Sequence, residues 1–139
     1  MACYPVKWLK QAEADLVAAG NSMVSRDYDW SCFQAQQAGE KALKAFLYEN
    51  GYTSIITHSL KELVMECEKI DPIFSTLKSD AKTLDAYYIS TRYPYGLGGD
   101  LPPSEYFKED DAEKCINCAT SILDTVKPFF QNSNDSSTD

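Results

Sequence analysis

A line of polar side chains on one long predicted helix is the first place where this chain could bind a phosphate or a base. The helix runs from Tyr28 to Asn50, and the polar residues recur at steps of three and four, which places them on one face. They are Trp30, Gln34, Gln37, Lys41, Lys44 and Tyr48. Two lysines and two glutamines between aromatic rings suit a nucleotide, but the same line could be a solvated stripe or a dimer seam.

An arginine among aromatic residues, in the segment Thr91-Arg92-Tyr93-Pro94, is the second candidate. Its guanidinium offers a fork of donors to phosphate or carboxylate, and nearby tyrosines could add stacking or hydroxyl contacts. The alternative is that Arg92 caps the carbonyl end of the preceding helix. The candidate ligand-binding residues are therefore Lys41, Lys44, Tyr88, Arg92 and Tyr93.

The remaining reactive residues do not form a recognisable catalytic or metal-binding motif. His58 is the only histidine and could exchange protons near neutral pH, but no nucleophile or carboxylate pair accompanies it, so a turn or capping role is expected. Cys115 and Cys118 form a single CxxC without a second ligand pair, which favours structural thiols over zinc. The glycine-rich phosphate-binding motifs do not occur. We expect no catalytic residue, no metal and no cofactor.

The composition describes one acidic domain. The 139 residues suffice for one hydrophobic core, and 44% hydrophobic with 24% charged residues is ordinary for a globular chain. The net charge of −8 argues against non-specific nucleic-acid binding, although a local basic site is compatible with it. No apolar run approaches the roughly 18 residues of a membrane span, and the first residues do not resemble a secretory signal. The odd number of cysteines favours free thiols, so a cytoplasmic location without membrane contact is expected.

Hydrophobic periodicity predicts the helices that would position these residues. A first helix begins near Pro5 and places apolar residues inward at steps of three and four. The helix from Tyr28 to Asn50 is apolar on several sides, so we expect it to be the central helix of a bundle, closed by Gly51. A third helix begins at Ser59, where Glu62 completes a capping-box pattern.

The second half of the chain combines two further helices with one long loop. A fourth helix is predicted from Asp71-Pro72 to about Ser90, with an inner face of Ile73, Leu77, Ala81, Leu84 and Tyr88. Residues 91–107 contain three prolines and three glycines, which preclude a regular helix. A last helix begins near Glu109 and bends or ends at Pro128, and residues 132–139 form a polar tail that is expected to be disordered. Residues 1–131 are thus predicted to form an all-α, antiparallel up-and-down bundle of about five helices.

Three stretches in this order resemble the HEPN domain family. They are WSCFQAQQAGEKALKAFL at 30–47, THSLKEL at 57–63 and LDAYYISTRYP at 84–94. The chain is similar to the stand-alone prokaryotic members and to the domain at the C-terminus of sacsin, over about residues 5–130. The resemblance implies an up-and-down helical bundle that usually forms a homodimer, in agreement with the bundle predicted from periodicity.

The resemblance also implies a function. The family name refers to nucleotide binding, and many stand-alone members are paired with a small nucleotidyltransferase, often as a toxin–antitoxin couple. Other branches are metal-independent ribonucleases with an Arg-x4–6-His motif. This chain has no histidine at that spacing after Arg92 or after Arg26, so the imidazole that would serve as general base is missing there.

The leading prediction is a non-catalytic, dimeric nucleotide-binding module that works with a nucleotidyltransferase partner and contacts a nucleotide or RNA. Arg92 and Lys41 or Lys44 would contact phosphate, while Tyr88 or Tyr93 would stack or donate a hydrogen bond. One alternative is a protein-interaction module without a ligand of its own. The other is a metal-independent ribonuclease whose catalytic groups lie around His58 and Arg92.

Overall fold

The computed structural model describes residues 3–88, 99 and 101–130, and the regular elements among these residues are helices, with no strand. In chain order the elements are α1 (Cys3–Val24), α2 (Tyr28–Glu49), α3 (Leu60–Ile70), the 3-10 helix η1 (Pro72–Leu77), α4 (Lys78–Ala86), α5 (Pro103–Tyr106) and α6 (Glu109–Val126). The predicted all-α class is therefore confirmed. None of the described helices is long and apolar enough to cross a membrane.

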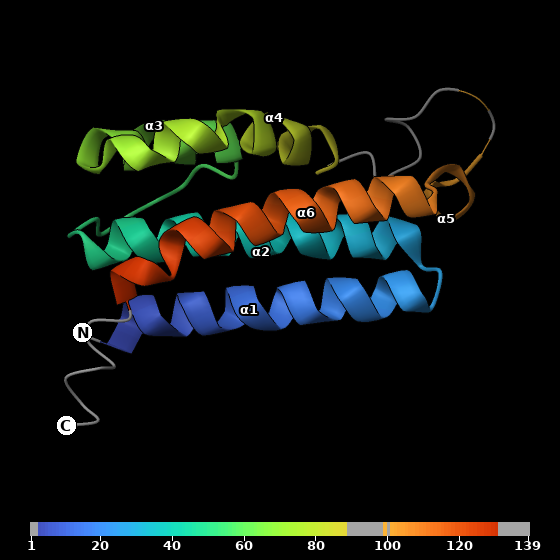
Figure 1. Cartoon of the computed structure of the whole chain (residues 1–139), viewed down its shortest axis with the longest axis horizontal. Coiled ribbons are helices and arrows are strands. Elements are labelled where there is room, and N and C mark those ends of the chain that lie inside the picture. Colours follow the sequence, from blue (N-terminus) through green and yellow to red (C-terminus); the bar gives the residue numbers. More distant parts are fainter. Residues whose placement is uncertain (1–2, 89–98, 100, 131–139) are drawn as a thin grey trace.

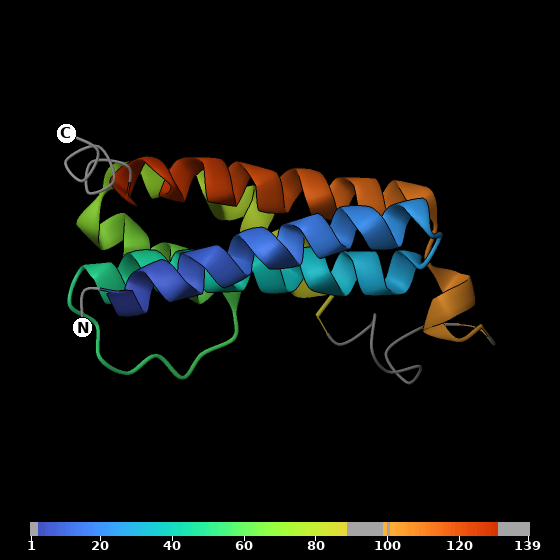
Figure 2. The ribbon, with the colours of Figure 1, turned by 90° about the horizontal axis from the view of Figure 1, so that it is seen from below.

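The helices form two layers (Figure 1). In the first layer α1 and α2 make an antiparallel hairpin, and α6 packs along both of them. The second layer consists of α3, η1 and α4, which contact α2 and α6 from the other side. The connection between α2 and α3 forms a wide arc beside the bundle (Figure 2). This arc carries the chain from the end of α2 back to its middle, where α3 begins.

The predicted central position of α2 is confirmed, since it contacts α1, α3, α4, α5 and α6. Its buried residues lie on all sides of the helix, as expected for an element enclosed by several partners. Gly39 marks the tightest approach. A Cβ atom at this position would lie 3.0 Å from Leu60, 3.1 Å from Ile122 and 3.2 Å from Leu84. A glycine here lets α3, α4 and α6 converge on one point of α2.

Local capping signals are confirmed where the sequence predicted them. The Ser59 hydroxyl accepts a hydrogen bond from the backbone N–H of Glu62 and begins α3. The carboxylate of Asp71 accepts from the backbone N–H of Ile73 at 3.0 Å, with Pro72 in the first position of η1. Gly51 follows α2 with a φ of +95°, a conformation that glycine adopts without strain.

The predicted fourth helix is wrong in three respects. It is split into η1 and α4, and α4 ends at Ala86, earlier than the expected end near Ser90. Ile73 was expected to face the core but is 47% exposed, and Phe74 is buried in its place. A 3-10 helix has three residues per turn and not 3.6, so the residues of η1 lie at other angles than a continuous α-helix would give them.

The second half of the chain gives one further difference and one agreement. A short helix, α5, lies inside the segment that was expected to be a loop. The last helix ends at Val126, just before the predicted bend at Pro128. The predictions for Arg92, Tyr93 and the tail 132–139 concern residues outside the described part of the chain.

Candidate functional site

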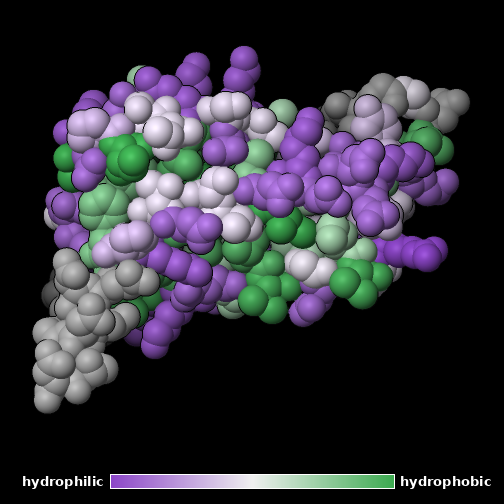
Figure 3. Space-filling view, viewed as in Figure 1, coloured by the Kyte–Doolittle hydropathy of each residue, from purple (hydrophilic) through white to green (hydrophobic). Residues whose placement is uncertain are grey.

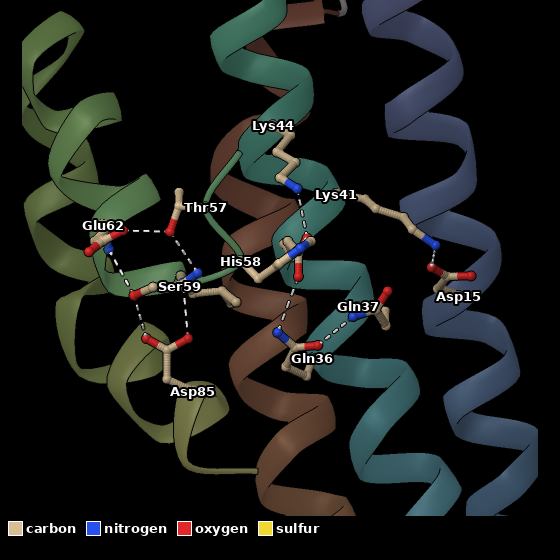
Figure 4. Close-up of polar contacts among 12 residues, drawn as sticks. Asp15, Gln36, Gln37, Lys41, Lys44, Thr57, His58, Ser59, Glu62 and Asp85 are labelled. Carbon is tan, nitrogen blue, oxygen red and sulfur yellow. Dashed lines mark hydrogen bonds and ion pairs between the residues drawn. The ribbon is translucent and has the colours of Figure 1, made fainter. Parts of the chain in front are cut away.

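The side chains of Glu40, Lys44, His58 and Tyr88 form one connected group beside α2; we call them the Glu40 cluster. Glu40 Oε2 lies 2.8 Å from Lys44 Nζ and 3.0 Å from His58 Nδ1. Gln36 Nε2 adds a longer contact of 3.4 Å to the other oxygen of Glu40. Figure 4 shows Lys44 and Gln36 on α2 and His58 on the chain that enters α3. Residues from all three stretches of the sequence resemblance thus come together here.

Glu40 and Lys44 form a buried ion pair at the centre of this cluster. The side chains of Glu40 and Lys44 are each only 6% exposed, one helical turn apart. Burying a single charge is costly, so each of these two groups requires the other. Lys44 Nζ also lies 5.7 Å from the centre of the Trp8 ring of α1, a favourable cation–π distance. The carboxylate and the ammonium neutralise one another.

The imidazole of His58 is held at one nitrogen and open to solvent. Its side chain is 62% exposed, although Nδ1 is bound to a buried carboxylate. An ionised carboxylate only accepts hydrogen bonds, so Nδ1 carries the proton and Nε2 is the nitrogen that a solvent molecule or ligand can reach. This is the geometry in which a carboxylate fixes the tautomer and the orientation of a histidine.

Aromatic rings extend from His58 along the edge of α2; we call Trp30, Phe33, Tyr88 and His58 the ring row. The His58 and Tyr88 rings are nearly parallel, at 13°, with centroids 6.1 Å apart, which corresponds to an offset stack. Tyr88 lies 6.4 Å from Phe33, and Phe33 lies 6.1 Å from Trp30. These contacts connect the end of α4 with the first turns of α2 and make a continuous aromatic surface.

Asp85 positions the chain on both sides of His58. Its carboxylate accepts hydrogen bonds from the backbone N–H groups of Leu60 at 2.7 Å and Lys61 at 3.0 Å, and from the Ser59 hydroxyl at 3.2 Å. A carboxylate at a helix N-terminus is stabilised by the unpaired N–H groups and the helix dipole. Figure 4 shows this contact between α4 and the start of α3. Because Asp85 precedes Tyr88 by one turn, the same contact also holds the end of α4 against the His58 segment.

The structure divides the predicted ligand residues into three groups. Lys44 and Tyr88 lie in the Glu40 cluster. Lys41 lies outside this cluster, with Nζ 2.6 Å from Asp15 of α1, and borders a depression of about 250 Å³ with Lys7, Trp8 and Gln11. Arg92 and Tyr93 are outside the described residues.

Side chains of α1 contact several residues of the polar line of α2 within the same chain. Ser22 donates to Gln34 at 2.7 Å, Asp15 pairs with Lys41, and Trp8 packs on Tyr48 with ring centroids 5.5 Å apart. Helical spacing correctly placed these residues on one face. It did not reveal that a neighbouring helix of mixed polarity would lie against them.

Sequence reasoning missed Glu40 and the partner of His58. Glu40 lies among Ala38, Gly39, Ala42 and Leu43, so an acidic residue on an apolar face, with a lysine four positions later, was the available signal. His58 was expected to serve a turn, and it does precede α3. Its contact with a carboxylate 18 positions earlier could not be inferred from local spacing.

The cysteines behave as structural residues, as the sequence predicted. Cys32, Cys67, Cys115 and Cys118 are buried and free. A hydrogen bond with Cys32, together with burial, raises the pKa of Cys115, and burial with a bond to Asp80 raises the pKa of Cys118 to about 11. Thiols in this state are poor nucleophiles and poor metal ligands. Among the described residues, no group of three or more His, Cys, Asp or Glu side chains could hold a metal ion.

Comparison with known proteins identifies the family of this chain. The sequence model of the HEPN domain family matches residues 6–129. The chain belongs to the HEPN domain family. The resemblance inferred from three short stretches is therefore confirmed over nearly the whole domain.

Relatives and solved structures cover most of this chain. "Putative toxin MJ1304" of Methanocaldococcus jannaschii is 29% identical over 137 residues, which is 92% of this chain and 89% of the relative. Human sacsin is 28% identical over 128 residues, 90% of this chain but only 3% of sacsin. The crystal structure of TT1696 from Thermus thermophilus has a TM-score of 0.84 at 34% identity and covers 92% of this chain and 98% of its own. ST0689, an archaeal HEPN homologue, has a TM-score of 0.74 at 36% identity over 89% and 95% of the two chains.

Proposed function

We propose that this HEPN domain binds a nucleotide, or the end of an RNA, at the ring row and the Glu40 cluster, without catalysing a reaction. The observation that supports the proposal is the exposed His58 ring, stacked beside Tyr88 and anchored by a buried carboxylate. Aromatic rings bind bases by stacking, at roughly 1–3 kcal/mol per base, with little dependence on base identity. A ring that is held in position loses little entropy when a base binds to it.

The phosphate groups need a positive charge that the described residues supply only in part. Lys44 is neutralised by Glu40, and Lys41 is paired with Asp15 of α1. Arg92 follows Tyr88 by four positions, close enough in sequence to reach the same edge of the domain. We assign the phosphate contact to Arg92, assisted by Lys44 and Tyr93, with Lys41 as the residue that would be used if the ligand extended toward α1.

Isothermal titration calorimetry against ATP, GTP and a short RNA, at low and moderate salt, tests this proposal. We expect saturable binding in the micromolar range that is lost in Arg92→Ala and in Tyr88→Ala. Arg26→Ala changes the only other arginine, and Tyr106→Ala removes an exposed tyrosine of α5, so these two variants serve as matched controls.

Two results would contradict the assignment. The phosphate role of Arg92 is wrong if Arg92→Ala and Arg26→Ala bind equally well. A folded protein that binds none of the three ligands would exclude the nucleotide site altogether. In that case the interaction-module alternative becomes the better explanation.

The wider role that we propose is that of a homodimer paired with a nucleotidyltransferase, as one half of a toxin–antitoxin couple. Its support is the similarity to the protein named "Putative toxin MJ1304". Co-expression with a nucleotidyltransferase gene, if one lies next to this gene, tests the pairing. Light scattering of the purified products tests whether the protein is a homodimer. A stable complex and a mass of two chains for the isolated protein are expected. A monomer that does not retain the partner would remove this role.

A second candidate function is metal-independent cleavage of RNA, and the His58–Glu40 geometry favours it. A histidine whose Nδ1 donates to a carboxylate presents Nε2 as a general base, here toward the 2′-hydroxyl of a ribose. Cleavage in the presence of EDTA, abolished in His58→Ala and retained in Arg26→Ala, would support this function. If RNA remains intact with the wild-type protein, the function is excluded, and the binding proposal is unaffected.

A further inference from the structure

A basic groove lies on the outer surface of the α3–α4 layer, on the side that faces away from α2. It has a volume of about 570 Å³ and is lined by Lys61, Met65, Glu68, Lys69, Lys78 and Lys82. α3 buries Leu60, Leu63, Val64 and Cys67, so the lining residues of α3 lie on its opposite, outward face. Figure 3 shows hydrophilic side chains projecting from the edge of the molecule that α3 and α4 form.

The charge of this groove is opposite to that of the whole chain. Four lysines and one glutamate line it, although the chain carries a net charge of −8. Lys69 pairs with Glu66 at 2.8 Å and Lys78 with Glu68 at 3.3 Å, and all four of these side chains are at least one-third exposed. Exposed ion pairs contribute about 0–1 kcal/mol, so an incoming carboxylate can replace either glutamate at low cost. Lys61 and Lys82 make no ion pair with any residue in the described ranges.

The floor of the groove is apolar. Met65 is 49% exposed on α3 between Lys61 and Lys69, and the methylene stems of the lysines add further apolar surface. Methionine adapts its shape to different apolar partners. From Lys61 to Lys69 the row along α3 spans eight residue steps, which corresponds to about 12 Å or two helical turns.

We propose that this groove binds a short amphipathic helix of a partner protein, with an apolar face on Met65 and acidic residues along both edges. A helix that lies in a groove between two helices places residues at steps of three and four along its length, and the lysines of α3 and α4 could pair with such residues on either side. The proposal concerns a different surface from the nucleotide site and does not depend on that function.

The residue types favour an acidic helix over a nucleic acid. The described residues that line the groove include neither an arginine, which binds phosphates in a fork geometry, nor an aromatic ring, which stacks on bases. A ribose–phosphate chain would also leave the apolar floor without a partner. A leucine or methionine of a helix would cover that floor and contribute hydrophobic binding energy.

Fluorescence anisotropy with a labelled peptide tests the proposal. The probe is a helix of about 15 residues, near the shortest length that is stable alone in water, with glutamates on one face and leucines on the other. Saturable binding is expected, and the double charge reversal Lys61→Glu/Lys82→Glu should weaken it at least about tenfold, because like charges then face each other. Met65→Gln should weaken it as well.

A second double variant, Lys10→Glu/Lys114→Glu, makes the same change in net charge on α1 and α6 and is the matched control. The proposal is overturned if both double variants lose affinity equally, since the effect would then come from net charge alone. It is also overturned if the peptide does not bind, or if a short single-stranded RNA binds the groove more tightly than the peptide. Circular dichroism of each variant verifies that the helical fold is retained.

Discussion

Lys41 and Lys44 lie one turn apart on α2, and each pairs with one carboxylate, yet the two pairs differ in their surroundings. Lys41 and Asp15 have side chains that are 25% and 16% exposed, and they connect α2 to α1 near the surface. Lys44 and Glu40 are 6% exposed, and their network continues through His58 to the α3 side of the domain. The same residue type in the same predicted line therefore serves two different purposes.

The difference shows that burial, and not the number of ion pairs, decides how strongly each side of α2 depends on its charges. An exposed pair contributes about 0–1 kcal/mol because water screens it. A buried pair contributes little net stability, but removal of one partner leaves an uncompensated charge in the interior. The α1 side should therefore tolerate substitution of its charged residues, whereas the α3 side should not.

Glu40→Gln tests this contrast where the largest effect is expected. The variant keeps the size of the side chain but leaves the Lys44 ammonium buried without a negative charge. Loss of one partner of a buried pair costs about 3–5 kcal/mol, so the free energy of unfolding should fall by that amount. Urea denaturation followed by circular dichroism measures the loss.

The matched control removes both charges at once. In Glu40→Leu/Lys44→Met the buried pair is replaced by apolar side chains of similar length, and the stability should stay within about 1 kcal/mol of the wild type or exceed it. If the single and the double variant lose equal stability, packing and not charge holds the α3 side together. That result would contradict the difference between the two sides.

The parts of the fold that could be predicted from sequence depend on local signals. Ser59 and Asp71 start their helices because their side chains accept a hydrogen bond two or three residues later, and that spacing is visible in the sequence. The central position of α2 followed from its apolar residues on several sides. The family followed from three stretches in order, and the match over residues 6–129 confirms it.

The parts that could not be predicted depend on contacts between distant residues. Asp85 binds Leu60 across 25 positions, and Glu40 binds His58 across 18. Periodicity shows which residues share a face but not which helix covers that face. Lys41 and Lys44 were therefore assigned to one ligand site, although Lys41 pairs with Asp15 of α1 and Lys44 pairs with Glu40.

Asp85→Ala tests whether the α3 side also depends on this single carboxylate. The variant removes three hydrogen bonds at the start of α3, two of them to backbone N–H groups. Bonds to a charged group contribute about 1.5–3 kcal/mol, and the loss of a helix cap alone about 1 kcal/mol, so a loss of about 2 kcal/mol is expected in urea denaturation. Asp71→Ala removes one cap bond and should cost about 1 kcal/mol. Equal losses would show that Asp85 is an ordinary cap.

Gly39 of α2 and Gly20 of α1 differ in the space that an added methyl group would find. Gly39→Ala places a methyl group about 3 Å from side chains of three other elements. Such overpacking costs about 1–3 kcal/mol of stability. The higher helix propensity of alanine, about 1 kcal/mol, offsets part of this loss. A Cβ atom at Gly20 of α1 would have no atom within 4 Å, so Gly20→Ala should gain about 0.5–1 kcal/mol. Thermal unfolding should therefore shift in opposite directions. A stabilised Gly39→Ala would mean that the α3 side can relax.

Asp15→Asn should give the smallest effect. The variant removes the negative charge that faces Lys41 but keeps a polar group of the same size, and the partly exposed lysine can turn to water. A loss of about 0.2–1 kcal/mol is expected at low salt, and it should decrease at high salt, because salt screens exposed pairs more than buried ones. The loss of stability in Glu40→Gln should change little at high salt, because that pair is buried. A loss above about 2 kcal/mol for Asp15→Asn would place both lysines in the same class and remove the distinction between the two sides of α2.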